Sequence, residues 1–269
     1  MSPPAGDGVA VLGVDFSGAT EAGRATWVAR GVAWPKGLEV HEVLPAAELP
    51  GGGRARDASL RALRELIAGS DAVWGLDFPF AVARSLMRSE DWAAFVDGFA
   101  ARYPTAEAFR DDCRECAEGR ELRRLTDREA KTPFSPSNLR LFRQTYYGIR
   151  DLLAPLVREG RARVLPMQRP HARRPLLLEV CPASTLKSLG LYRPYKQPNP
   201  ATARAALIDT LTSRGVLLPC PPAVRERILA DGRGDALDAV LAAVACARAL
   251  DRTTFAFTRD HLVEGYVFF

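Results

Sequence analysis

Two short apolar runs each carry an aspartate just before their last residue, and this repeated pattern constrains the fold more than any other feature of the chain. The first run, Val9–Phe16, contains Asp15 within GVDFSG, and the second, Ala72–Phe78, contains Asp77 within GLDFPF. Apolar, β-forming runs of this length that are bounded by turn residues predict buried strands. A carboxylate is costly to bury without a metal, a basic partner or backbone donors. We therefore expect each strand to end at a polar site, although Asp15 could instead cap the turn that follows it.

The order of the elements around these runs predicts the class of the fold. Two strand-like segments, Ala25–Trp34 and Leu38–Val43, follow the first run at short distances and so predict an antiparallel set. An amphipathic helix is expected over Asp57–Ala68 because its leucines recur at helical spacing. A fifth strand is indicated at Pro175–Val180. We expect an α/β protein whose mixed sheet has three antiparallel strands, then parallel strands, with flanking helices.

The middle of the chain, residues 81–163, has the pattern of a helical insertion within one domain that spans residues 1–269. One large core is compatible with this length, because single cores stop growing near ~250–300 residues. Within the insertion, three helices and a polar, proline-containing span are expected: Trp92–Tyr103, Ala106–Glu118 and Leu139–Glu159, with the span Leu125–Ser137 before the last helix. After the fifth strand we expect, in order, a short helix, a loop, three helices and an edge strand: Ser184–Leu189, Tyr192–Pro200, Ala201–Arg214, Ala223–Ala230, Asp235–Leu250 and Tyr266–Phe269.

Composition indicates a cytoplasmic protein rather than a membrane or secreted one. The chain is 47% hydrophobic, and its uncharged apolar runs stay well below the ~18 residues that a membrane-spanning helix needs. The N-terminal segment MSPPAGDG carries an acid and no basic cluster, unlike a secretory signal. Five cysteines, an odd number, favour reduced thiols over a disulfide framework. Cys113 and Cys116 form a C-x-x-C pair, but a zinc site would need a second pair or suitably spaced histidines.

The formal charge of +5 comes almost entirely from arginine, since the chain has only four lysines. Arginine binds phosphate through its planar fork, which makes polyanionic ligands plausible. The same usage is also what a GC-rich genome produces. Charge therefore favours nucleic acid only slightly.

A third acidic segment, GDALDAVLAA, places Asp235 and Asp238 three residues apart in the first turn of a predicted helix. Residues at this spacing share one helix face. The helix dipole stabilises anions there without any metal, so Asp235 could be a simple N-cap. Asp238 is harder to explain in that way, because the surrounding helix is apolar and its face should pack against the sheet.

Carboxylates brought together from these segments would form an oxygen-rich site suited to Mg²⁺ or Mn²⁺. Two such ions can activate a water and stabilise the leaving oxygen of a phosphodiester. The sequence contains no G-x-S-x-G elbow, no H-E-x-x-H motif and no G-x-x-x-x-G-K-[ST] phosphate loop. These patterns favour a metal-dependent hydrolase that needs no nucleophilic serine or cysteine.

The segments GVDFSGA, GLDFPF, LEVCPASTLKSLG and GDALDAVLAA together resemble the uncharacterised family known as domain of unknown function 429, predicted nucleases with the ribonuclease H-like fold. The pattern is also distantly similar to the RuvC-type Holliday-junction resolvases. The resemblance covers both ends of the chain and little of the helical middle. It implies that Asp15, Asp77, Asp235 and Asp238 hold the metals. Our hypothesis is that Asp15 bridges the two ions, Asp77 and Asp238 complete the shell and Asp235 assists.

Further residues are candidates for contact with substrate. Glu179 lies in the E-x-x-P part of the resemblance, where it would neighbour the site, although a salt bridge to one of the nearby arginines is the stronger interpretation. Lys187 is a candidate phosphate contact. Basic and aromatic residues alternate over residues 140–150, including Arg143, so this stretch could grip phosphates and stack bases; an aromatic core stripe is the competing interpretation. Residues 126–128 and 193–196 could also line a cleft.

The resulting hypothesis is a metal-dependent nuclease that acts on nucleic acid, either DNA or RNA. One alternative is a non-catalytic nucleic-acid-binding protein of the same fold. Another is an actin-like or sugar-kinase-type ATP phosphotransferase, whose first strand also ends in an acidic, glycine-bearing turn like Asp15–Gly18. That class needs a second phosphate loop and an adenosine site, and the sequence shows neither. The long apolar C-terminal helix could face the sheet or a partner, so a homodimer stays open.

Overall fold

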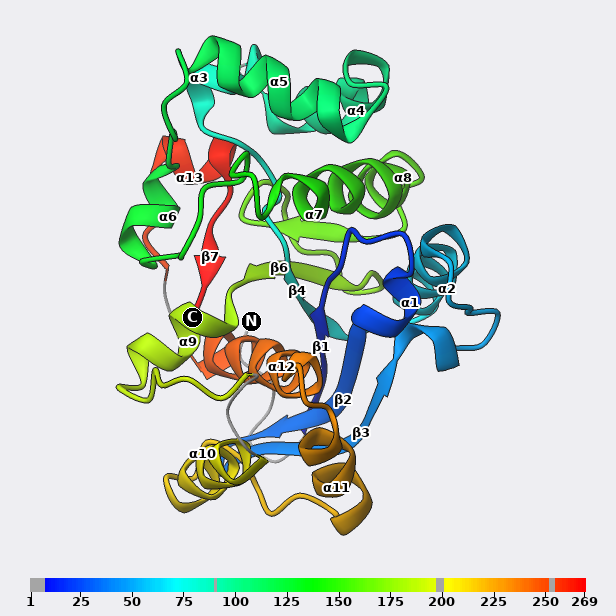
Figure 1. Ribbon diagram of the computed structural model, residues 1–269, viewed down its shortest axis with the longest axis vertical. Helices are drawn as coiled ribbons and strands as arrows, with labels where there is room; N and C mark the ends of the chain where they lie inside the picture. The colour runs from blue at the N-terminus through cyan, green and yellow to red at the C-terminus, as the bar shows by residue number, and fades with distance from the viewer. Residues whose placement is uncertain (1–7, 90, 197–200, 252–254) are drawn as a thin grey trace.

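The computed structural model describes residues 8–89, 91–196, 201–251 and 255–269 (Figure 1). The first seven residues, which contribute to the expectation that the chain has no secretory signal, lie outside the described part. So do residues 197–200 of the loop expected at Tyr192–Pro200. In the described ranges no helix is long and apolar enough to cross a membrane.

A seven-stranded mixed sheet organises the described part of the chain. The strand order is β3-β2-β1-β4-β6-β5, and β7 pairs with β6 beyond the end of β5. The first three strands are antiparallel, and β4, β5, β6 and β7 run parallel to β1. The strands are β1 (Val9–Asp15), β2 (Trp27–Trp34), β3 (Gly37–Pro45), β4 (Val73–Asp77), β5 (Arg163–Leu165), β6 (Leu176–Val180) and β7 (Val267–Phe268). The expected α/β class and mixed sheet are confirmed.

Helices cover both faces of this sheet. They are α1 (Ala22–Ala25), α2 (Arg56–Ala68), α3 (Arg84–Met87), α4 (Trp92–Arg102), α5 (Ala106–Cys116), α6 (Leu125–Glu129), α7 (Phe142–Tyr147), α8 (Ala154–Arg158), α9 (Pro182–Ser188), α10 (Ala201–Ser213), α11 (Pro222–Ala230), α12 (Asp235–Asp251) and α13 (Arg259–Glu264), with the short turns η1 (Ala46–Glu48) and η2 (Gly148–Leu153). Figure 1 shows α12 below β4 and β6 in the view and α7 and α8 above them, with α4 and α5 at the top.

Successive side chains along each strand point to opposite faces of the sheet, so the buried residues form two layers. In β1, Leu12 and Val14 belong to the buried cluster that includes α2 and the middle helices, whereas Val11 belongs to the cluster that includes α12. Trp74 and Val73 of β4 divide in the same way. The sheet is therefore a middle layer with one apolar core on each face.

Two glycines allow α12 to lie directly on the central strands. A Cβ placed at Gly13 would be 2.1 Å from the carbonyl oxygen of Ala239, and one at Gly75 would be 2.6 Å from that of Ala242. Any larger residue at either position would force the helix away from the sheet. This close packing fixes where the acidic first turn of α12 lies relative to the ends of β1 and β4.

Several elements differ from the sequence-based expectation. β2 begins at Trp27 rather than Ala25, because residues 22–25 form the helical turn α1. The helix expected over Leu139–Glu159 begins at Phe142 and contains the π-helical stretch η2 just before Pro155. Proline has no N–H to donate, so the regular helical ladder is interrupted there. The span expected to be irregular at 125–137 contains α6, and β5 and α13 had no sequence signal.

The helices of the middle segment share their core with the sheet. Phe95, Phe99 and Tyr146 belong to the same buried cluster as Leu12 of β1 and Leu63 of α2. Among the aromatic residues of the 140–150 stretch, Tyr146 therefore lies in the core, as the competing interpretation held. The division of the chain into one domain with an insertion at residues 81–163 stays a prediction.

Candidate active site

The structure brings the four predicted aspartates to one edge of the sheet. Asp15 and Asp77 are register partners in the parallel pair β1 and β4, so both lie where these strands end. They share the strand face of Gly13 and Gly75, the glycines on which α12 packs. Asp235 and Asp238 lie in the first turn of α12.

Burial differs among the four carboxylates. Asp15 and Asp238 are almost fully buried, with exposed fractions of 8% and 4%. The Asp235 side chain is 16% exposed and lies 3.1 Å from the Nε of Arg233. Asp235 is not the N-cap of α12 in this arrangement, because Asp231 accepts the Ala236 N–H at 2.8 Å.

The loop before α10 supplies two side chains that close on these acids. Tyr195 donates its hydroxyl to a carboxylate oxygen of Asp238. The ammonium of Lys196 forms an ion pair with the other oxygen of Asp238 and lies 3.8 Å from Asp235. The sequence indicated only that residues 193–196 could line a cleft. Their partners could not be identified, because the pairing joins segments about 40 residues apart.

The acidic cluster holds more negative charge than its surroundings neutralise. Burial, followed by repulsion from Asp238, Asp77 and Asp235, raises the pKa of Asp15 well above its usual value. Burial and then Asp238 raise the pKa of Asp77 to about 8, and burial raises that of Asp235 to about 6. Burial also raises the pKa of Asp238, although Lys196 opposes this effect.

The chemistry of the donors fits a divalent cation, because hard ions such as Mg²⁺ and Mn²⁺ prefer carboxylate oxygen. The arrangement of the side chains does not enclose one. In the residues that the structure describes, no group of three or more His, Cys, Asp or Glu side chains is placed to hold a metal ion. The positive charge at Asp238 comes instead from Lys196, and that at Asp235 from Arg233 and Lys196.

The acids open into a cleft of about 600 Å³. Its wall joins Asp15, Asp77, Asp235 and Asp238 to residues from the turn after β1, the loop before α7 and the start of α9. Tyr192, Arg193 and Lys196 form one side. The four carboxylates thus line a cleft rather than a closed core.

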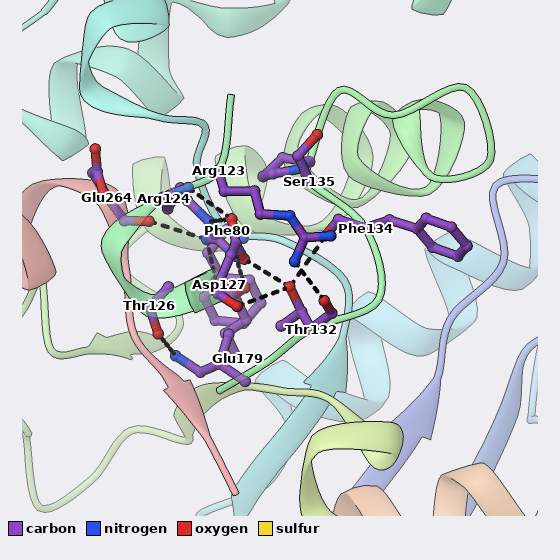
Figure 2. A network of polar contacts seen from close by, with 12 residues as sticks. Phe80, Arg123, Arg124, Thr126, Asp127, Thr132, Phe134, Ser135, Glu179 and Glu264 are labelled. Carbon is purple, nitrogen blue, oxygen red and sulfur yellow. Dashed lines mark hydrogen bonds and ion pairs between the residues drawn. The ribbon is translucent and has the colours of Figure 1, made fainter. Parts of the chain in front are cut away.

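Glu179 lies at the same edge but on the opposite face of the sheet, where it forms an ion pair with an arginine, although not with a nearby one as the sequence suggested. Its partner, Arg124, is 55 positions away in the chain and as deeply buried, with 1% of its side chain exposed. Arg124 also pairs with Asp127 at 2.8 Å, and Phe80 N–H donates to Glu179 at 2.9 Å (Figure 2). These contacts use both oxygens of Glu179, which also lines the cleft that contains the four aspartates.

The remaining candidates lie away from the four aspartates. Lys187 donates to the backbone carbonyl of Lys131 and is not among the described residues that line the acidic cleft. Arg143 forms an ion pair with Glu107 at 2.7 Å and lines a neighbouring cleft. Cys113 is buried and Cys116 exposed, and both are free thiols.

No protein-family model matches this chain, and neither a curated protein nor a solved structure matches it. We therefore infer function from the site itself.

Proposed function

We propose that the protein is a metal-dependent phosphodiesterase that acts on nucleic acid, with a ribonuclease H-like fold. The observation that carries this proposal is the convergence of Asp15, Asp77, Asp235 and Asp238 at one edge of the sheet. The sheet order, in which three antiparallel strands are followed by parallel β4, supports the fold that the sequence resemblance implies.

The electrostatics of the cluster favour a divalent cation. Four carboxylates face two cations, Lys196 and Arg233, and burial followed by mutual repulsion raises the pKa values of Asp15 and Asp77. Asp15, Asp77 and Asp238 would hold the metal, with Asp235 assisting. Bound there, Mg²⁺ or Mn²⁺ would supply Lewis-acid stabilisation of charge on a phosphodiester.

Lys196 has a defined part in this proposal. Without metal, its ammonium pairs with Asp238 and offsets part of the negative charge of the acidic cluster. For Asp238 to hold a metal, the Lys196 ammonium would have to move away from this carboxylate. The loop that carries Lys196 forms one wall of the cleft, so its movement would also change the space open to substrate.

The test compares wild-type protein with Asp15→Asn on labelled single-stranded and branched oligonucleotides in Mn²⁺. We expect cleavage by the wild type and none by the variant, while the thermal melts of the two proteins stay nearly equal because the amide is nearly isosteric. Cleavage retained by Asp15→Asn would defeat the assignment. Salt-dependent oligonucleotide binding without cleavage by wild type would indicate the non-catalytic alternative.

A further inference from the structure

A second cleft, of about 560 Å³, lies beside the acidic one and has the opposite charge. Three arginines line it, Arg56, Arg140 and Arg143, together with residues 17–20 of the turn after β1. Among its described lining residues there is no Asp or Glu. A surface of this kind attracts anions.

The two clefts are joined by a rigid wall. Ser17 and Gln144 line both of them. Gln144 donates its side-chain amide to the backbone carbonyl of Asp77 at 2.6 Å. A Cβ at Gly18 would be only 2.5 Å from the carbonyl oxygen of Arg143, so the turn after β1 packs directly on the backbone of α7. The backbone that carries Arg143 thus packs directly beside the end of β4 that carries Asp77.

Arg56 is held in place but retains donor capacity. Its guanidinium lies 3.5 Å from the centre of the Tyr147 ring and donates to the carbonyl of Gly18 at 3.2 Å. Its Nε is buried and has no hydrogen-bond partner in the described part of the chain. Such a buried, unpartnered donor is costly unless a ligand or water accepts from it.

The other two arginines face solvent. The Arg143 side chain is 56% exposed and pairs with Glu107, and Arg140 is also exposed. Within the described residues neither Arg140 nor Arg56 forms an ion pair with a carboxylate. The positive charge of Arg140 and Arg56 is therefore available to a ligand.

We propose that this arginine cleft binds the phosphate backbone of a nucleic-acid strand, next to the phosphodiester that lies at the carboxylates. The inference rests on the proposed function and adds how substrate is gripped. Because the Tyr147 ring contacts Arg56 and also lies 5.0 Å from the guanidinium of Arg150, the cleft offers guanidinium groups rather than an open ring for base stacking. Binding should therefore be independent of base sequence.

The test is fluorescence anisotropy with a labelled single-stranded oligonucleotide, in EDTA, over a range of salt concentrations. The variant is Arg140→Gln/Arg143→Gln. The control is Arg120→Gln/Arg158→Gln, which removes the same charge at exposed arginines paired with Glu118 and Asp97. Each phosphate contact contributes about 0.7 to the slope of log K against log salt, so the variant should lose about 1.4 in slope and bind about 25-fold more weakly at ~0.1 M salt.

Three outcomes decide the proposal. A reduced slope in the variant, with the control unchanged, supports the arginine cleft. Equal slopes in the variant and the wild type would overturn it. If Arg140→Gln/Arg143→Gln lost ATP binding but kept oligonucleotide binding, the proposal would also be overturned, because the cleft would then accept a free nucleotide. The EDTA measurement does not need the metal site, so failure of the nuclease proposal appears separately, as absent cleavage in Mn²⁺.

Discussion

At the scale of single residues, Lys196 determines the state of the acidic cluster. It is the cation that pairs with Asp238 and lies near Asp235, and it lowers the cost of keeping Asp15 and Asp77 ionised. Burial disfavours its charge, but Asp238 and Asp15 outweigh burial and raise its pKa. A cation in this position competes with a metal ion for the same carboxylates.

Lys196→Met should therefore separate stability from metal binding. In EDTA we expect the variant to lose about 1–2 kcal/mol of unfolding free energy, less than for a fully buried pair because the Lys196 side chain is half exposed. Added Mn²⁺ should then raise the melting temperature of the variant more than that of wild type. The control is Lys36→Met, at an exposed turn. Equal Mn²⁺-induced shifts in all three proteins would remove Lys196 from this role.

The raised pKa of Asp77 makes a second prediction at this scale. An aspartate whose pKa rises from 3.8 unfolded to about 8 folded binds more protons in the folded state between these values. The free energy of unfolding of the metal-free protein should therefore fall as pH rises from about 4 to about 8, then level off. Urea denaturation in EDTA at several pH values measures this slope, which Asp77→Asn should reduce. An unchanged slope in Asp77→Asn would show that other groups produce it.

At the scale of elements, the contact of α12 with β1 and β4 forms the site. The sequence indicated both strands, the helix and their acids, because each has its own periodicity and turn signals. It could not indicate that Gly13 and Gly75 lie beneath α12, since a glycine within a strand does not show what approaches it. Short elements such as β5 also lacked a signal, because three residues are too few for a period to appear.

Gly13→Ala tests this packing. Its new Cβ would fall 2.1 Å from the backbone of α12, so we expect a loss of about 1–3 kcal/mol or more in unfolding free energy, together with weaker metal binding. Gly98→Ala is the matched control, because a Cβ there, inside α4, meets nothing within 4 Å. It should stabilise the protein by about 1 kcal/mol. Equal urea midpoints for both variants would contradict the close packing of α12.

At the scale of the whole molecule, the buried network around Arg124 joins three distant parts of the chain. Arg124 pairs with Asp127 beside it and with Glu179 of β6, and it donates to the carbonyl of Glu264 at the end of α13 (Figure 2). The sequence suggested one of the nearby arginines as the partner of Glu179, but the partner is a distant one. The chain has 33 arginines, and only the fold determines which of them meets Glu179.

Arg124→Met should destabilise the whole fold, because it leaves Asp127 and Glu179 buried without their cation. We expect a loss of about 3–5 kcal/mol. Arg158→Met removes an exposed pair with Asp97 and should cost at most about 1 kcal/mol. Urea denaturation of both variants makes the comparison. A small loss for Arg124→Met would mean that the network contributes little to stability.

The measurement that tests the central claim most directly is isothermal titration of Mn²⁺ into wild type, Asp15→Asn and the exposed control Asp71→Asn. We expect saturable binding to wild type and to Asp71→Asn, and loss of that binding in Asp15→Asn. Absence of saturable binding to wild type, or equal binding by Asp15→Asn, would contradict a metal site at the carboxylates of β1, β4 and α12.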